Sequence, residues 1–348
     1  MLNSVDPLTS GLSINAVAPI RICDIGGWTD TWFARSGAVF NIAIYPYVEV
    51  QIRPTRTGPG SRSFTLAVEN YGDTYALEPS NLTLGKHPLL EAALDIMDLP
   101  EDVSLEINIF SEAPPGAATG TSAAVSVALI GALDRLTRGR LCPHEVAALA
   151  HSIETEKLGL QSGIQDQLAS AYGGINFIEM HAYPHASVSG IQLPNPVWWE
   201  LEQRLSVVYI GSPHNSSEIH RRVIEKLGER AHESPLLREM TGLAREAKNA
   251  LYEASFPALG EVMNRNTELQ RQLHPGLVCD RFEEIIALAG DFGALGCKVN
   301  GAGGDGGSVT ILSDGDMAQK RRMLKAISAC SYSVLPFYLS RQGLRVWE

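Results

Sequence analysis

The feature that most constrains this chain is a glycine-rich loop between an alternating strand and a helix that is apolar on all sides. Apolar and polar residues alternate strictly over residues 103–109, which is typical of a half-buried strand. The loop 114–120 follows, and small apolar residues then continue over 121–136. A helix without a polar face must be buried. The sequence therefore predicts a strand, a tight loop and a core helix in one unit.

The start of that helix is a candidate site for a phosphate. The first backbone N–H groups of a helix have no partner within it and lie at the positive end of its dipole, so an anion suits them. The lysine of a P-loop, GxxxxGK[ST], is missing, so this is a different motif. A plain turn capped by Thr121 or Ser122 is the alternative, and the loop alone does not decide between them.

A second glycine-rich segment, residues 297–308, reads CKVNGAGGDGGS. Ordering so many glycines costs conformational entropy. We therefore expect another chain segment or a ligand to approach this backbone closely. A flexible hairpin between two apolar strands is the alternative.

A third segment, residues 18–31, reads APIRICDIGGWTDT. It predicts a strand carrying Arg21, followed by a Gly-Gly turn bearing Asp24, Trp28 and Asp30. Two carboxylates, an indole and a guanidinium suit a polyol ligand, because they offer hydrogen-bond partners and an apolar wall. A turn stabilised by its own aspartates, with Arg21 at the surface, is the alternative.

Composition excludes several classes of protein. The 348 residues carry a net charge of −11, which argues against nucleic-acid binding because phosphate backbones need a positive surface. No apolar run approaches the roughly 18–20 residues that span a bilayer, and the first residues lack the pattern of a secretory signal. The five cysteines are widely spaced and form no CxxC pair, so neither a zinc site nor a disulfide framework is indicated. We expect a soluble cytoplasmic protein that does not associate with membranes.

The order of elements predicts an α+β chain of two domains. Gly58, Pro59 and Gly60 predict a hairpin turn between strands at 38–52 and 63–68. The proline-containing stretch 183–196 is the candidate boundary, which gives domains at 1–190 and 191–348. Further helices are expected near 86–97, 143–153, 163–172, 217–227, 236–251, 257–273, 281–289 and 317–329. Further strands are expected near 175–180, 205–210, 297, 308–312 and 334–339.

Together and in this order, the three segments resemble the GHMP kinases, which include galactokinases, homoserine kinases and mevalonate kinases. The family's middle motif PPGxGLGSSAA is similar to PPGAATGTSAA here, and its last motif KxTGAGGGG is similar to KVNGAGGDGG. The turn GGWTDT and residues 163–177 resemble the sugar branch with L-fucose kinases and D-glycero-D-manno-heptose 7-phosphate kinases. Gly27 and Trp28 stand where galactokinases carry a Glu-His pair, which argues against galactose. Asp305 replaces a glycine of the last motif, and the sequence offers no reason for it.

The resemblance implies a two-domain fold with its active site in the cleft between the domains. The N-terminal domain would resemble a ribosomal-protein domain, and the C-terminal domain would be ferredoxin-like. The implied activity is ATP- and Mg2+-dependent phosphorylation of a hydroxyl, the anomeric one in this branch, of a sugar or sugar phosphate. Two alternatives stay open, namely a catalytically inactive relative that binds a sugar or nucleotide, and a kinase of a non-sugar alcohol. The sequence does not give the oligomeric state.

The resemblance also implies roles for individual residues. Asp166 would be the catalytic base, and Arg21 would lie beside the nucleophilic hydroxyl. Ser122, with Thr121 as second choice, and Glu154, with Glu156 as second choice, would hold Mg2+. The residues expected to hold the ATP phosphates are Pro115, Gly116, Ala117, Ala118, Thr119, Gly120, Thr121 and Ser122. Those expected to bind the substrate are Asp30, Gly27, Trp28, Gly301, Gly303 and Gly304.

The loop 211–217 follows a predicted strand and is a further candidate to face the substrate. His214 within it is better explained as an ordinary loop residue than as a catalyst. No lysine or arginine occurs in the loop before Arg221. A heptose 7-phosphate would need a cation for its phosphate, so this loop argues against that substrate.

Overall fold

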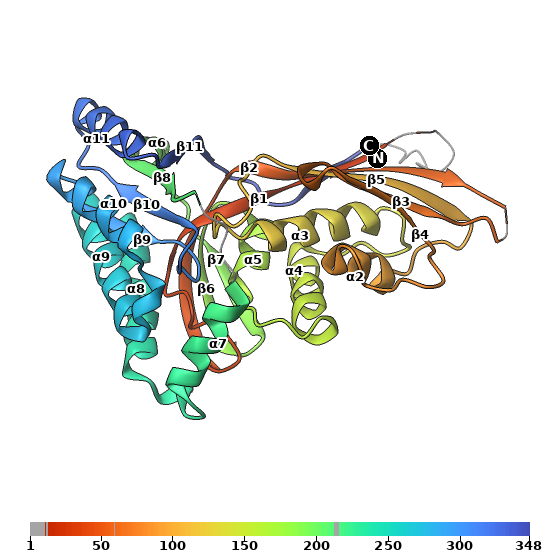
Figure 1. The fold of residues 1–348 in the computed structure, drawn as a ribbon, viewed down its shortest axis with the longest axis horizontal. Coiled ribbons are helices and arrows are strands. Elements are labelled where there is room, and N and C mark those ends of the chain that lie inside the picture. The colour runs from red at the N-terminus through yellow and green to blue at the C-terminus, as the bar shows by residue number, and fades with distance from the viewer. Residues whose placement is uncertain (1–10, 12, 59, 212–215) are drawn as a thin grey trace.

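The α+β prediction is confirmed by the computed structural model, which describes residues 11, 13–58, 60–211 and 216–348 (Figure 1). The strands form a nine-stranded sheet and a four-stranded sheet. Helices cover one side of the long first sheet, and further helices lie on the outer side of the second sheet at the other end of the molecule. Within the described residues, every helix is too short or too polar to span a bilayer.

The first sheet is built around β2, a strand of twenty residues. Its path runs β13-β1-β2-β5-β3-β4, and β6 and β12 also pair with β2 while β7 pairs with β6. Nearly every residue of β1 and the first eight residues of β2 are buried, whereas the rest of β2 alternates between buried and more exposed residues. The strand bounds are Ile14–Ile25 (β1), Gly37–Arg56 (β2), Phe64–Val68 (β3), Asp73–Leu77 (β4), Val103–Ser111 (β5), Ile175–Ala182 (β6), His185–Gly190 (β7), Tyr338–Leu339 (β12) and Arg345–Trp347 (β13).

Helix α3 (Thr121–Asp134) is the core helix that the sequence predicted. Residues on every side of it are buried, from Ala123 to Asp134, and it packs on β1 and β2. The helices α2 (Pro88–Ile96), α4 (Pro143–Ser152) and α5 (Gln165–Tyr172) pack around it. The loop before α3 is therefore held between the first sheet and these helices.

The second sheet confirms the ferredoxin-like prediction. Its strands are β8 (Leu205–Tyr209), β9 (Gly296–Val299), β10 (Ser308–Leu312) and β11 (Ser333–Leu335), in the spatial order β11-β8-β10-β9. All neighbours are antiparallel. Together with α10 (Asp280–Asp291) and α11 (Met317–Ala329), they form a βαββαβ unit with its own apolar core around Phe282 and Ile311.

The remaining helices connect the two sheets. They are α6 (Asn195–Arg204), α7 (Ser216–Leu227), α8 (Pro235–Tyr252) and α9 (Phe256–Leu273). Helix α9 packs on β9 of the second sheet, while α8 packs on α9 and on β2 of the first. These contacts fix the second sheet against the first.

Two local predictions are wrong. The strands on either side of the expected hairpin, β2 and β3, do not pair with each other, because β5 lies between them and pairs with both. The expected single strand 334–339 is divided, since β11 pairs with β8 of the second sheet and β12 with β2 of the first. Both errors concern pairing between distant segments, which a local pattern does not specify.

The stretch 183–196 was the predicted boundary, and it holds β7 up to Gly190 and the start of α6. We keep the division into 1–190 and 191–348 as a proposal. The last strands, β12 and β13, return to the first sheet, where they pair with β2 and β1.

The return of the C-terminal segment to the first sheet depends on Gly173, the residue after α5. A Cβ atom there would lie 2.1 Å from the carbonyl carbon of Gln342, and the φ angle is 65°. Gly72 has the same φ angle but open space around it. We expect Gly72→Ala to lower the free energy of unfolding by about 1 kcal/mol, and Gly173→Ala to cost a further ~1–3 kcal/mol through overpacking. Urea unfolding measures both, and equal losses would contradict the close docking of the C-terminal segment.

Candidate active site

A cavity of about 570 Å³ lies where the first sheet, the loop before α3 and the second glycine-rich segment meet. It gathers most of the residues that the sequence singled out. Those that line it are Arg21, Asp24, Trp28, Asp30, Pro115, Gly116, Ala117, Ala118, Thr119, Gly120, Thr121, Ser122, Glu154, Asp166 and Gly301. Segments far apart in the chain therefore form one site.

The loop before α3 takes an unusual backbone path. Gly116, Ala118 and Gly120 all have positive φ angles. Gly120 is the N-cap of α3, and no side chain caps this helix start in the described structure. The helix thus begins with amide groups that suit an anion. Thr121 and Ser122 are the first two residues of the helix and do not serve as its cap, so the expected Thr/Ser cap of the plain-turn alternative is absent from the described structure.

The carbonyl groups of this loop bond to the rest of the protein. The Arg21 amide donates to the Thr119 carbonyl at 2.9 Å, and the Arg21 Nη1 donates to the Ala118 carbonyl. The hydroxyl of Ser308 donates to the Ala117 carbonyl at 2.6 Å. With three successive carbonyls occupied in this way, the orientation of the loop is fixed before any ligand binds.

Arg21 and Asp166 form a bidentate ion pair beside the loop. The distances are 2.8 Å from Nε to Oδ1 and 2.9 Å from Nη2 to Oδ2. The side chain of Arg21 is 5% exposed and that of Asp166 is 24% exposed. Burial disfavours the charge on Arg21, but Asp166 and Asp24 outweigh it and raise the pKa of the guanidinium. A Cβ atom at Gly120 would lie 3.2 Å from the Asp166 carboxylate, so the pair touches the helix start.

A second buried ion pair joins the first segment to the second glycine-rich segment. Lys298 Nζ lies 3.3 Å from Asp24 Oδ1, and both side chains are 1% exposed. The Gly301 amide donates to both oxygens of Asp24, at 3.0 and 3.1 Å. Burial would raise the pKa of Asp24, yet Lys298, Arg21 and this amide lower it, so the carboxylate stays charged. Burial lowers the pKa of Lys298, and Asp24 opposes that effect.

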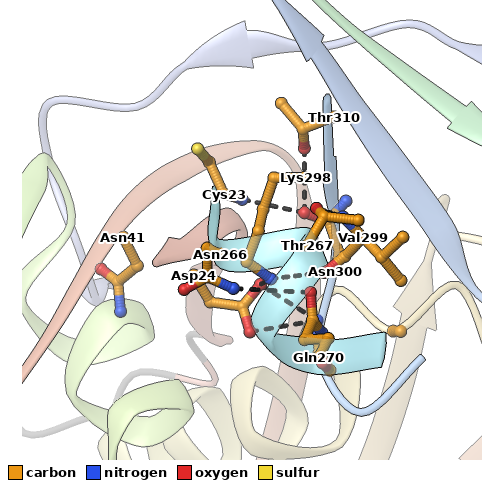
Figure 2. Close-up of polar contacts among 12 residues, drawn as sticks. Cys23, Asp24, Asn41, Asn266, Thr267, Gln270, Lys298, Val299, Asn300 and Thr310 are labelled. Atoms are coloured by element: carbon orange, nitrogen blue, oxygen red, sulfur yellow. Dashed lines mark hydrogen bonds and ion pairs between the residues drawn. The ribbon is translucent and has the colours of Figure 1, made fainter. Parts of the chain in front are cut away.

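Figure 2 shows how Asn300 extends this contact. Its Oδ1 accepts from the Cys23 amide and from the Thr310 hydroxyl, each at 2.9 Å. Its Nδ2 donates to the Ser308 Oγ, which in turn donates to the loop carbonyl of Ala117. One buried amide side chain thus connects β1, β10 and the loop before α3.

Other parts of the chain closely approach the backbone of the second glycine-rich segment. A Cβ atom at Gly301 would lie 3.0 Å from the Ala118 carbonyl, so the two glycine-rich segments touch. Gly303 and Gly304 do not line the cavity. A side chain at Gly303 would collide with the Leu277 carbonyl, and the Gly304 amide donates a hydrogen bond to that same carbonyl at 3.0 Å. Packing within the protein therefore accounts for these two glycines. Asp305 is exposed and also lies outside the cavity lining.

Asp30 is buried at the floor of the cavity. It is 3% exposed and accepts from the Gln165 amide at 3.0 Å. Burial raises the pKa of Asp30 to about 6, with a further contribution from Asp166. A Cβ atom at Gly163 would lie 2.0 Å from Asp30 Oδ2, so a glycine is required there. No sequence pattern predicted this role of Gly163.

Glu154 lies on a π-helical turn, Ile153–Lys157, which continues α4. Gln167 Nε2 donates to its Oε2 at 3.0 Å, while its Oε1 is buried without a hydrogen-bond partner. Burial is the main reason that the pKa of Glu154 is raised to about 7; Ser162 and Gln167 oppose this rise, and Asp166 adds to it. The structure describes no group of three or more His, Cys, Asp and Glu side chains arranged to hold a metal ion.

Two groups of side chains contribute to the lining of the cavity. In the first, which we name the Trp28 arm, Trp28 and His220 stack edge to face at 4.8 Å, and His220 Nδ1 lies 2.9 Å from the Gln161 carbonyl. Asp30 and Gly163 complete this arm. Gly27 lies behind it, against Asp24, and does not line the cavity. His214 lies outside the described residues.

The second group, which we name the Tyr71 arm, consists of Asn70, Tyr71, Lys86, His87 and Leu89. The rings of Tyr71 and His87 lie 5.4 Å apart. Lys86 and His87 both pair with Asp73. This arm was not predicted, because its residues come from a turn and a helix start that carry no recognisable motif.

Comparisons with known proteins agree with this geometry. A family model described as GHMP kinases N terminal domain matches residues 88–174, and one described as GHMP kinases C terminal matches residues 247–327. The D-glycero-alpha-D-manno-heptose 7-phosphate kinase of Campylobacter jejuni is 26% identical over 97% of this chain and 99% of its own. The mevalonate kinase of Pyrococcus abyssi is 32% identical over 74% of this chain and 73% of its own.

A solved structure shares the fold. It is a D-glycero-D-manno-heptose 1-phosphate kinase from Bacteroides thetaiotaomicron, with a TM-score of 0.76 and 20% identity. The alignment covers 96% of this chain and 99% of that one.

The ion pair between Asp24 and Lys298 generates a stability prediction. Lys298→Met leaves a carboxylate buried without its lysine, so we expect the free energy of unfolding to fall by about 3–5 kcal/mol. The double variant Asp24→Asn/Lys298→Met removes that charge as well and should be more stable than Lys298→Met. Urea unfolding tests this, with Lys157→Met at the exposed pair with Asp95 as the control, where the loss should be within about 1 kcal/mol. A double variant less stable than Lys298→Met would refute the pairing.

Asp30 generates a pH prediction. Its pKa in the folded protein, about 6, is above the ordinary value of ~3.9. The folded state therefore binds more protons than the unfolded state between about pH 4 and pH 6, and the free energy of unfolding falls as pH rises through that window. Asp30→Asn should remove this pH dependence. The free energy of unfolding of the variant, relative to that of the wild type, should therefore rise by up to ~3 kcal/mol between pH 4 and pH 8. Urea unfolding at both pH values measures this difference, with Asp280→Asn at an exposed aspartate as the control. If the difference in free energy of unfolding between Asp30→Asn and the wild type were the same at both pH values, the assignment would be contradicted.

Proposed function

This chain belongs to the GHMP kinases, and from this premise we propose that it transfers the γ-phosphoryl group of ATP to a hydroxyl, the anomeric one, of a sugar or sugar phosphate. Kinases of this family use ATP as the phosphate donor. The full-length likeness to a heptose phosphate kinase supports a sugar acceptor.

One observation carries the proposal, namely the Arg21–Asp166 pair at the start of α3. Asp166 lies in the first turn of α5, where a carboxylate is favoured, and its side chain faces the cavity. It can accept the proton of an acceptor hydroxyl held on the Trp28 arm. Arg21 holds the carboxylate in place through two hydrogen bonds and offsets negative charge where the phosphoryl group would be transferred.

The loop 115–122 supplies the phosphate site. Its carbonyls bond to Arg21 and Ser308, which leaves the amides at the start of α3 for the phosphates of ATP. The Tyr71 arm lines the same cavity as this loop and offers aromatic and apolar surface. We assign the adenine base to the Tyr71 arm and the acceptor to the Trp28 arm.

The residues present fit a divalent cation. Glu154 Oε1 is a buried carboxylate oxygen without a partner, and the cavity it lines also holds the exposed Ser122. A carboxylate and a hydroxyl suffice for Mg2+, which keeps several of its waters. Ser122 and Glu154 would hold the ion, and Mg2+ would neutralise charge on the ATP phosphates.

A second candidate is the kinase of a non-sugar alcohol. The archaeal mevalonate kinase is 32% identical to this chain over 267 residues, a higher identity than that of the heptose kinase over a shorter length. The Asp-bearing turn GGWTDT favours the sugar acceptor, because Asp30 accepts hydrogen bonds from hydroxyl groups but repels a carboxylate.

We place the reaction in the cytoplasm. All five cysteines are free, and Cys142 and Cys330 are exposed, which suits a reducing compartment that supplies ATP.

Replacement of Asp166 tests the mechanism. Asp166→Asn keeps the shape of the side chain and a hydrogen-bond acceptor for Arg21, and Asp24 and Asp30 still face that guanidinium. We expect kcat to fall about 10²–10⁴-fold, because the base is lost, with KM for ATP within about threefold of wild type and an unchanged circular dichroism spectrum.

The matched control is Asp280→Asn. Asp280 also lies in the first turn of a helix, is exposed, and is remote from the cavity. Its kcat should equal that of the wild type. A kcat for Asp166→Asn within about threefold of the control would refute the assignment of the base.

A further inference from the structure

The positive charges around the cavity are few and already engaged. Among the described residues that line it, Arg21 and Lys86 are the only lysine or arginine side chains. Arg21 uses its three nitrogens on Asp166 and the Ala118 carbonyl. Lys86 pairs with Asp73 and belongs to the Tyr71 arm.

The Trp28 arm adds no lysine or arginine. Arg221, next to His220 on α7, pairs with Glu225 at 3.0 Å and does not line the cavity in the described structure. Arg222 likewise lies outside the lining. The residues that the structure does not describe contain no lysine or arginine in the sequence.

Carboxylates outnumber these cations. Asp24, Asp30, Glu154 and Asp166 line the cavity against Arg21 and Lys86. Asp30 belongs to the Trp28 arm itself, and Asp166 is the proposed base beside it. The basic side chain of this arm is His220, which is engaged with Trp28 and the Gln161 carbonyl. A phosphate or carboxylate on the acceptor would therefore meet Asp30 and Asp166 with no lysine or arginine beside it, and contacts between like charges are costly.

The same arm is well suited to uncharged hydroxyl groups. Asp30 accepts hydrogen bonds, and the Trp28 Nε1 is a buried donor without a partner in a side chain that is 5% exposed. The part of the Trp28 ring that lines the cavity adds an apolar contact. One donor, one acceptor and an apolar contact suit a neutral polyol.

We infer that the acceptor of this kinase is an uncharged sugar, and that sugar phosphates, uronic acids and carboxylate-bearing alcohols such as mevalonate are rejected. This inference rests on the proposed function, because it concerns the acceptor of that reaction. The charge of the Trp28 arm thereby limits the acceptor to one chemical class, the uncharged sugars.

The test compares matched neutral and anionic acceptors. The purified full-length protein with ATP and Mg2+ is given D-glycero-D-manno-heptose and its 7-phosphate, D-mannose and its 6-phosphate, and D-galactose and D-galacturonate. L-fucose, L-arabinose and mevalonate complete the set. Coupled ADP release gives kcat/KM, and mass spectrometry verifies the phosphorylated product.

The expected result is transfer to neutral sugars, with kcat/KM at least about 10²-fold higher for the neutral member of the best pair. A higher kcat/KM for the phosphorylated or carboxylated member, or for mevalonate, overturns the inference and leaves the proposed kinase function intact. ATP binding measured by calorimetry without transfer to any acceptor overturns the proposed function, and the inference with it.

A variant tests the role of charge directly. Gln161 is exposed and lines the cavity next to His220, and its Oε1 accepts a hydrogen bond from Trp32 Nε1 at 2.5 Å. Gln161→Lys replaces that contact with a cation at the edge of the Trp28 arm. The ratio of kcat/KM for the anionic member to that for the neutral member should rise about tenfold. Gln192→Lys, an exposed glutamine outside the lining, is the matched control and should leave the ratio unchanged. An unchanged ratio in Gln161→Lys would contradict the electrostatic account.

Discussion

Two buried ion pairs fix the geometry of this site, and the rest of the structure depends on them. Arg21 on β1 binds Asp166 on α5, and Asp24 at the end of β1 binds Lys298 on β9. One strand thus carries a residue of each pair. Because that strand also donates its Arg21 amide to the loop before α3, the loop, the helix α5 and the second sheet all take their positions from β1.

Such an arrangement is not the most stable way to fill a protein interior. Buried ion pairs often contribute less than apolar packing, because desolvation offsets much of their attraction. The contribution of these pairs is instead to hold the segments of the site in fixed positions. The Asp24 carboxylate holds the Gly301 amide, Gly301 lies against Ala118, and Arg21 binds the Ala118 carbonyl. The two glycine-rich segments are thereby held in contact, and carboxylates that repel one another, such as Asp30 and Asp166, stay in one cavity.

The sequence predicted the elements of this site better than their connections. The alternating strand β5 and the all-apolar α3 follow from periodicity alone, and three short motifs led to the family and to Arg21 and Asp166 as partners in one cleft. The pairing of Asp24 with Lys298 joins residues 274 positions apart, and no local pattern specifies such a contact. The same limit explains why β5 was not expected between β2 and β3, and why Gly163 was not connected with Asp30.

The central claim is that the loop before α3 and the Arg21–Asp166 pair together hold the triphosphate of ATP against the acceptor. A crystal structure with a non-hydrolysable ATP analogue tests it most directly. The account predicts phosphate oxygens bonded to backbone amides of residues 116–122, the terminal phosphate facing Asp166, and the adenine on the Tyr71 arm. An analogue whose triphosphate lies away from that helix start, with Asp166 facing no phosphate, would contradict it.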